Sequence, residues 1–121
     1  MNIQIPGVDL DKLYEQYEDD IDLYAKVSRS YITTTRATLD KIRTVSTETL
    51  ADYAVFIHSI KGASTSICAE QTREAALVLE KLAKAGDLTG VLAANQAFLK
   101  QADKLVDDIR KWLEQFDANK K

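Results

Sequence analysis

The sequence predicts an all-α protein, an up-down antiparallel four-helix bundle with a short additional helix at its N-terminus. The 121 residues include only four glycines and one proline, and this scarcity of helix breakers favours long helices over a sheet with many turns. Apolar residues also recur at helical spacing through most of the chain. Connections of only a few residues place consecutive helices antiparallel. Residues 1–121 are therefore expected to form one domain.

The first two predicted helices follow acidic residues that favour a helix N-terminus. Asp9 can accept the free amide protons of a short helix from about Leu10 to Glu18. The acidic cluster within residues 18–22 suits the positive end of a second helix, which is expected to run to about Arg43. The middle of that helix, residues 31–35, is rich in β-branched side chains and weakens the prediction locally.

Three further helices are predicted in the second half of the chain. Ser46 or Thr47 can cap the third helix, with Glu48 in its first turn, and Gly86 can close the fourth. The third helix is expected to end at about Ile67, the fourth to run from near Glu70 to Ala85, and the fifth from about Leu88 to Phe116. Residues 117–121 are expected to fray.

Composition narrows the class of protein. The formal net charge is -3 with acids and bases interleaved, so we expect no nucleic-acid partner. A single cysteine, Cys68, cannot form an internal disulfide, and the chain opens without a secretory signal, which together predict a cytoplasmic setting. The longest uncharged run, residues 88–99, is too short to span a bilayer, so no direct membrane contact is expected.

The only histidine, His58, lies in the segment FIHSIKGASTSICA, residues 56–69. On a helix it falls about 150° from the centre of the apolar face that holds Ile57 and Ile60, and is therefore predicted to face water. The residues predicted beside it on the outer surface include Ala54, Lys61, Gly62 and Thr65.

Gly62 is informative because glycine costs about 1 kcal/mol relative to alanine inside a helix. It lies one turn from His58, where any side chain would cover the imidazole, so Gly62 and the small Ala54 are expected to leave the ring open. Lys61 can place a positive charge near an anion at the ring, and Thr65 offers a hydroxyl. This pattern is typical of a site that accepts a phosphoryl group.

A neutral, accessible imidazole nitrogen is a nucleophile that can accept a phosphoryl group. The chain has no glycine-rich phosphate loop and no kinase motifs, so we expect it to bind no nucleoside triphosphate and to receive the phosphoryl group from another protein. One histidine cannot supply the paired motifs of a di-iron bundle, so neither a metal site nor a cofactor is expected.

The segment IHSIKGASTSICAEQTREAALVLE, residues 57–80, resembles the signature of histidine-containing phosphotransfer (HPt) domains. These four-helix bundles relay phosphoryl groups between response-regulator receiver domains in two-component phosphorelays. The matching residues are His58, Lys61, Gly62, Ala63, Ala69, Glu70, Leu79 and Glu80. The stretch IPGVDLDKLYEQYEDDIDLYAKV is similar to the opening helix and acidic turn of such domains, so the resemblance covers nearly the whole chain. Cys68 stands where the family usually has glycine, which puts in question the shape of the turn between the third and fourth helices.

The resemblance implies that Nε2 of His58 accepts the phosphoryl group and that the protein is a phosphoryl carrier, not an enzyme. Receiver domains would be the partners, with a hybrid sensor kinase as a further candidate, and the receiver would supply the aspartyl phosphate and the magnesium ion. We expect docking to use the small residues around His58 and the second helix near residues 31–35, and we expect a monomer. The alternative is an adaptor or structural bundle that binds a signalling partner without carrying phosphate.

Overall fold

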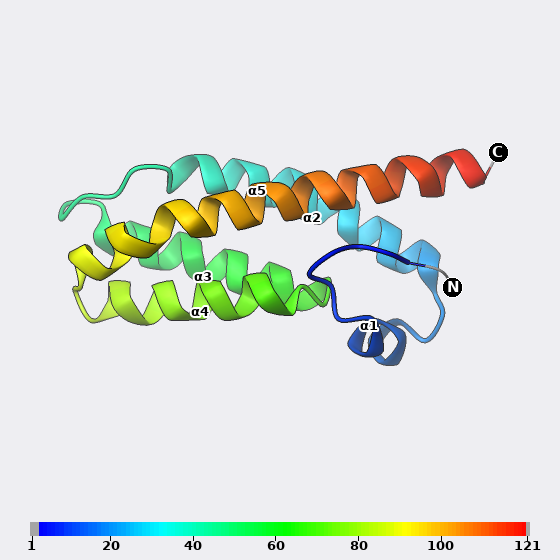
Figure 1. The fold of residues 1–121 in the computed structure, drawn as a ribbon, viewed down its shortest axis with the longest axis horizontal. Coiled ribbons are helices and arrows are strands. Elements are labelled where there is room, and N and C mark those ends of the chain that lie inside the picture. Colours follow the sequence, from blue (N-terminus) through cyan, green and yellow to red (C-terminus); the bar gives the residue numbers. More distant parts are fainter. Residues whose placement is uncertain (1–2, 121) are drawn as a thin grey trace.

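A computed structural model describes residues 3–120, and these residues form five α-helices and no strand. The helices are α1 (Leu10–Tyr17), α2 (Ile21–Lys41), α3 (Leu50–Ser66), α4 (Glu70–Lys84) and α5 (Leu88–Asn119). Helices α2 to α5 lie along the long axis of the molecule in alternating directions, and α1 lies below the end at which α3 turns into α4 (Figure 1). The predicted all-α class is confirmed, and five mutually packed helices fit a bundle with one additional N-terminal helix.

Most predicted helix ends agree with the structure because local side chains determine them. The carboxylate of Asp9 accepts the backbone N–H of Lys12 at 3.2 Å and caps α1, as predicted. Asp20 caps α2 in the same way through the N–H of Leu23, at 3.0 Å. Gly86, at φ +73°, follows the last turn of α4 in the left-handed conformation that glycine adopts without strain.

Helix α3 begins later than predicted. Neither Ser46 nor Thr47 caps it, because residues 47–49 form a turn before the helix starts at Leu50. The hydroxyl of Thr49 accepts the N–H of Ser46 at 2.9 Å and thus closes this turn instead of capping α3. The expectation that Glu48 lies in the first turn of the helix was therefore wrong.

The predicted fraying after Phe116 was also wrong for most of that tail, since α5 continues to Asn119. Asp117 makes a bidentate ion pair with Arg29 of α2, and Lys120 pairs with Asp22 at the start of the same helix. These two pairs hold the end of α5 against α2. The remaining residue of the predicted tail, Lys121, lies outside the described residues.

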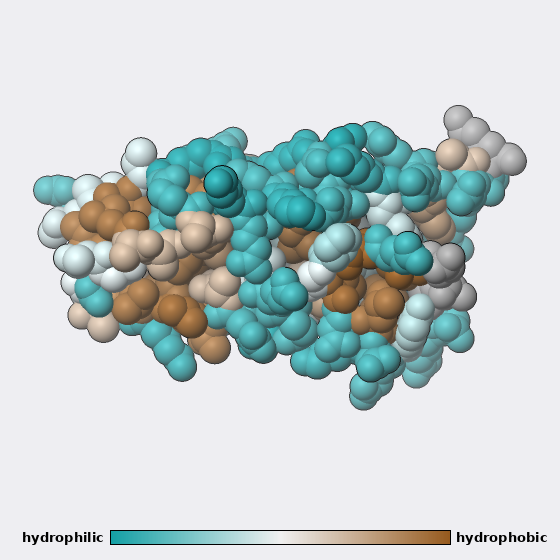
Figure 2. Space-filling model, viewed as in Figure 1, coloured by the Kyte–Doolittle hydropathy of each residue, from teal (hydrophilic) through white to brown (hydrophobic). Residues whose placement is uncertain are grey.

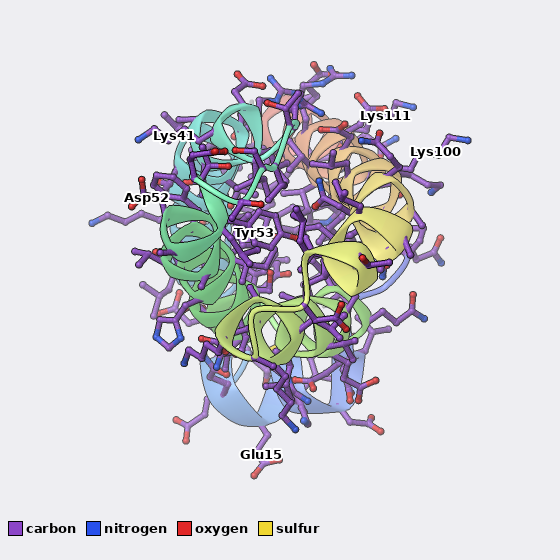
Figure 3. The ribbon with its side chains drawn as sticks, turned by 90° about the vertical axis from the view of Figure 1, so that its left-hand side faces the viewer. Glu15, Lys41, Asp52, Tyr53, Lys100 and Lys111 are labelled. Carbon is purple, nitrogen blue, oxygen red and sulfur yellow. The ribbon has the colours of Figure 1, made fainter. Side chains whose placement is uncertain are left out.

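The core lies between the four long helices. Viewed along the bundle, Tyr53 points inward between the helices, whereas Lys41, Asp52 and Lys100 project outward (Figure 3). The hydroxyl of Tyr53 donates to Oδ1 of buried Asn95 at 2.8 Å, and Nδ2 of Asn95 donates to the carbonyl of Ile42 at 2.9 Å. Tyr53 and Asn95 are thus paired inside the core, as burial favours, whereas the buried hydroxyls of Ser28 and Thr35 have no hydrogen-bond partner among residues 3–120.

The turn from α3 to α4 is held by side chains from α1 and α2. Tyr17 donates its hydroxyl to the carbonyl of Ser66 at 2.6 Å, and Tyr24 donates to the carbonyl of Ile67 at 2.9 Å. Cys68 follows at φ +62°, the left-handed conformation that glycine would adopt freely, and its side chain is buried. The turn therefore has a conformation suited to glycine, although a cysteine occupies the position.

The surface is mostly hydrophilic on the face viewed in Figure 2, with hydrophobic patches near both ends of the molecule. Among residues 3–120, the exposed large hydrophobic side chains are Leu23, Val55, Val78 and Leu92. Among the helices of residues 3–120, none combines the length and the apolar composition that crossing a membrane requires.

Candidate functional site

His58 lies in the middle of α3, close to the line along which α4 packs on that helix. Its side chain is 63% exposed, so the prediction that it faces water is confirmed. The ring is not isolated, because Nδ1 lies 2.5 Å from Oε2 of Glu80 on α4. Nε2 makes no hydrogen bond with any residue between positions 3 and 120.

Glu80 is the centre of the site. Its side chain is only 3% exposed, yet both carboxylate oxygens are paired. Oε1 accepts from Nζ of Lys61 at 2.6 Å, and Oε2, which also contacts His58, lies 3.2 Å from Nζ of Lys84. Two ammonium groups and one imidazole thus surround a single buried carboxylate, which satisfies the requirement that a buried charge be paired.

The ionisation of Glu80 determines which nitrogen of His58 carries the proton. Burial raises the pKa of the Glu80 carboxyl, but hydrogen bonds from Lys61, His58 and Lys84 outweigh burial and lower it to about 2. The carboxylate is therefore ionised at neutral pH and can only accept hydrogen bonds. Because it accepts from Nδ1, the neutral ring carries its proton there and presents the lone pair of Nε2 to solvent.

The structure corrects the predicted position of Ala54. This residue is buried, with 9% exposure, and is not on the open outer surface. The prediction considered only the apolar stripe of α3 as buried. Helix α4 also packs against the neighbouring side of α3, which holds Ala54. Ala54 instead lines a hollow of about 230 Å³ beside the ring, together with Val55, His58, Glu80 and Lys84. A larger side chain at position 54 would fill this hollow.

The other predicted site residues have different environments. A Cβ atom placed on Gly62 would meet no atom within 4 Å, so the helix surface next to His58 is open there. Lys61 is only 25% exposed and is turned toward Glu80. Thr65 is exposed, but its hydroxyl donates to the carbonyl of Lys61 at 3.1 Å, within its own helix. Of these three residues, only Lys61 is brought to the group around Glu80.

From the sequence, Glu80 was identified only as a match to the HPt signature, and neither Glu80 nor Lys84 was predicted to contact His58. A signal was present, because the buried stripe of α4 contains Ala76, Leu79 and Ala83, and Glu80 is a carboxylate within that stripe. An acid at such a position requires a buried cationic partner. Lys84, one turn later, is the local candidate, whereas the contact with His58 joins residues 22 positions apart and depends on how α3 and α4 pack.

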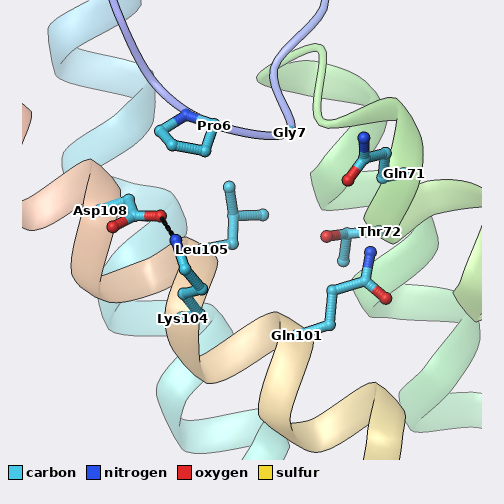
Figure 4. Close-up of a pocket in the computed structure, with 8 residues that line it drawn as sticks. All are labelled: Pro6, Gly7, Gln71, Thr72, Gln101, Lys104, Leu105 and Asp108. Carbon is cyan, nitrogen blue, oxygen red and sulfur yellow. Dashed lines mark hydrogen bonds and ion pairs between the residues drawn. The ribbon is translucent and has the colours of Figure 1, made fainter.

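Other hollows lie away from this group, among them the following two. One of about 260 Å³ is formed by residues 6–7 with α4 and α5, and its two charged side chains, Lys104 and Asp108, pair with each other at 2.6 Å (Figure 4). The other, of about 430 Å³, is a largely apolar groove between α2 and α3, whose lining includes Leu23, Tyr31 and Ala63. Neither hollow includes His58.

Within residues 3–120, no cluster of three or more histidine, cysteine or acidic side chains has an arrangement that could hold a metal ion. Comparison of the chain with protein-family models, with curated proteins and with solved structures found no match. The functional interpretation therefore depends on the residues and their geometry.

Proposed function

We propose that this protein is a histidine phosphotransfer protein or domain of the cytoplasm. In this proposal His58 accepts a phosphoryl group from an aspartyl phosphate of a response-regulator receiver domain and passes it to another receiver. The observation that carries the proposal is the exposed ring of His58. Its Nδ1 is hydrogen-bonded to the ionised, buried carboxylate of Glu80, so that Nε2 faces solvent. Helices α2 to α5 would be the four-helix bundle of an HPt-like domain, with α1 as its additional helix.

The transfer step follows from this geometry. The lone pair of Nε2 attacks the phosphorus atom, the bond between phosphorus and the aspartyl oxygen breaks, and the aspartate leaves as a carboxylate with the bonding pair. The ring becomes positively charged while Nδ1 keeps its proton. Glu80, held at 2.5 Å from Nδ1, stabilises that charge without a proton transfer. Because this transfer step is reversible, the same arrangement serves when His58 donates the phosphoryl group to the second receiver.

A receiver that approaches Nε2 would also cover the surface around His58. The side of α3 next to the ring is open at Gly62, and Val55, one turn before Ser59, is 62% exposed. The apolar groove between α2 and α3 lies on the other side of α3, and Tyr31 in its lining falls within the part of α2 expected to contact the partner. We propose that the receiver spans α3 and contacts both the open surface around His58 and the apolar groove between α2 and α3. The magnesium ion would belong to the receiver, and one exposed histidine per chain is sufficient for a monomer.

The proposal is tested by incubation of the protein with a panel of receiver domains phosphorylated on their aspartates. The expected result is an acid-labile, base-stable label on the wild-type protein and no label on His58→Gln. Ser59→Ala is a matched control, because Ser59 is exposed on α3 beside His58 and its hydroxyl donates only to the carbonyl of Val55, within the helix.

Two outcomes would contradict the proposal. If no phosphorylated receiver labels the wild-type protein, the phosphotransfer function is wrong, and a non-phosphorylated adaptor bundle becomes the better interpretation. If His58→Gln is labelled as well as the wild type, another side chain is the nucleophile.

A further inference from the structure

The two lysines that pair with Glu80 differ in how free they are to leave it. We infer that Lys84 is the residue that moves to the phosphoryl group on His58, whereas Lys61 stays on Glu80 and positions the ring through it. This inference rests on the proposed phosphotransfer function and refines it, because the sequence pattern alone assigns the phosphoryl contact to Lys61.

Lys61 is held in place by the burial of its partner. It is the only described side chain that pairs with Oε1 of Glu80, at 2.6 Å, and Glu80 is 3% exposed. If Lys61 turned outward, it would leave a carboxylate oxygen buried and without a hydrogen bond, which carries a large desolvation cost. The side chain of Lys61 is only 25% exposed, and it reaches across from α3 to Glu80 of α4.

Lys84 is in the opposite situation. Its side chain is 64% exposed, and it shares Oε2 of Glu80 with Nδ1 of His58. If Lys84 moves away, Oε2 still accepts the hydrogen bond from His58, so no buried atom loses its last partner. Because the Lys84 side of this ion pair is open to solvent, the pair contributes little stability and Lys84 is readily exchanged to a more highly charged group. A phosphoryl group with a charge close to -2 is such a group.

The shape of the surface agrees with this assignment. The hollow of about 230 Å³ next to the ring is lined by Ala54, Val55 and His58 of α3 and by Glu80 and Lys84 of α4, and Lys61 is not part of its lining. The hollow gives the Lys84 side chain room to change rotamer toward Nε2. The phosphoryl group would thus meet a mobile cation from α4, while Lys61 and Glu80 keep the ring in one tautomer.

The test uses phosphoramidate as a small phosphoryl donor, so that no receiver is needed. The lone pair of Nε2 forms the new bond to phosphorus, the P–N bond of phosphoramidate breaks, and ammonia leaves with the bonding pair. The pH titration of the ³¹P signal of the phosphohistidine is then recorded for the wild type, Lys84→Gln, Lys84→Arg and Lys61→Gln. Lys81→Gln is the matched control, because it removes the same charge from an exposed position of α4 that makes no ion pair with any residue in the described part of the chain.

A nearby cation favours the dianionic phosphoryl group, so removal of Lys84 should raise the midpoint of the ³¹P titration by roughly half a pH unit. Lys84→Arg should restore the wild-type midpoint, and Lys81→Gln should leave it unchanged. Because only one histidine is present, ¹⁵N NMR of the unmodified protein reports the tautomer of His58 directly. Lys61→Gln should change the tautomer populations, whereas Lys84→Gln should preserve them.

Two results separate this inference from the proposed function. If Lys61→Gln shifts the ³¹P midpoint and Lys84→Gln does not, the assignment of the two lysines is overturned while phosphotransfer stands. If phosphoramidate and phosphorylated receivers both fail to phosphorylate the wild-type protein, the proposed function is overturned, and this assignment with it.

Discussion

Replacement of Glu80 by glutamine tests whether the buried carboxylate supports the site as the structure indicates. The pKa of Glu80 is about 2 in the folded protein, against an ordinary value of 4.5. A difference of one pKa unit corresponds to about 1.4 kcal/mol, so the ionised carboxylate contributes at most about 3 kcal/mol to the free energy of unfolding at neutral pH. Its partners Lys84 and His58 are largely exposed, and solvent screening reduces this contribution to about 2 kcal/mol.

The sign of the pH dependence follows from the lowered pKa. A carboxyl group whose pKa is lower in the folded state stabilises the protein fully above its unfolded pKa, and that stability is lost as the pH falls through the folded pKa. The contribution of Glu80 should therefore be present at pH 7 and decline between about pH 5 and pH 2. Glu80→Gln has no group to titrate there, so its stability should depend less on pH across this window.

Urea unfolding at pH 7, 5, 4 and 3 measures this difference. We expect Glu80→Gln to be about 2 kcal/mol less stable than the wild type at pH 7, with the gap narrowing toward pH 3. Glu15→Gln is the control, since Glu15 is an exposed residue of α1 that forms no ion pair with any described residue. A gap between the wild type and Glu80→Gln that stays constant from pH 7 to pH 3 would refute the reasoning.

Substitutions at two further positions test the turn after α3 and the open surface beside the ring. Cys68→Gly should be at least as stable in urea as the wild type, because glycine removes the strain of φ +62°, whereas Cys68→Val should lose about 2 kcal/mol; equal losses would show that the conformation at this position is unimportant. Gly62→Ala should raise stability by up to about 1 kcal/mol because its Cβ has free space. Gly62→Leu should fold but slow transfer from a phosphorylated receiver, and an unchanged rate would count against the open-surface argument.

The sequence was sufficient for those parts of the fold that depend on local interactions. Asp9 and Gly86 mark helix ends through capping and backbone preference, and both predictions agree with the structure. The predicted start of α3 was wrong because Thr49 accepts the backbone N–H of Ser46 and closes a turn before the helix. Several residues in a row can cap a helix here, and the sequence alone does not show which of them does. The predicted end of α5 was wrong because the last turns of this helix are held by Arg29 of α2, which is distant in the sequence.

The candidate site shows the same division. The exposure of His58 follows from the apolar stripe of α3 alone, so the sequence predicted it. Its partner Glu80 could not be identified in this way, because periodicity gives the face of each helix but not how α3 and α4 are rotated against each other. The burial of Ala54 was missed for the same reason.

The central claim is that Glu80 fixes the proton on Nδ1 of His58 and thereby makes Nε2 the phosphoryl acceptor. The most direct measurement is ¹⁵N and ³¹P NMR of the protein after phosphorylation by phosphoramidate, in which the single histidine gives one set of ring signals. We predict a phosphoryl group on Nε2 with Nδ1 still protonated. A phosphoryl group on Nδ1, or a proton on Nε2 of the unmodified ring, would contradict the account.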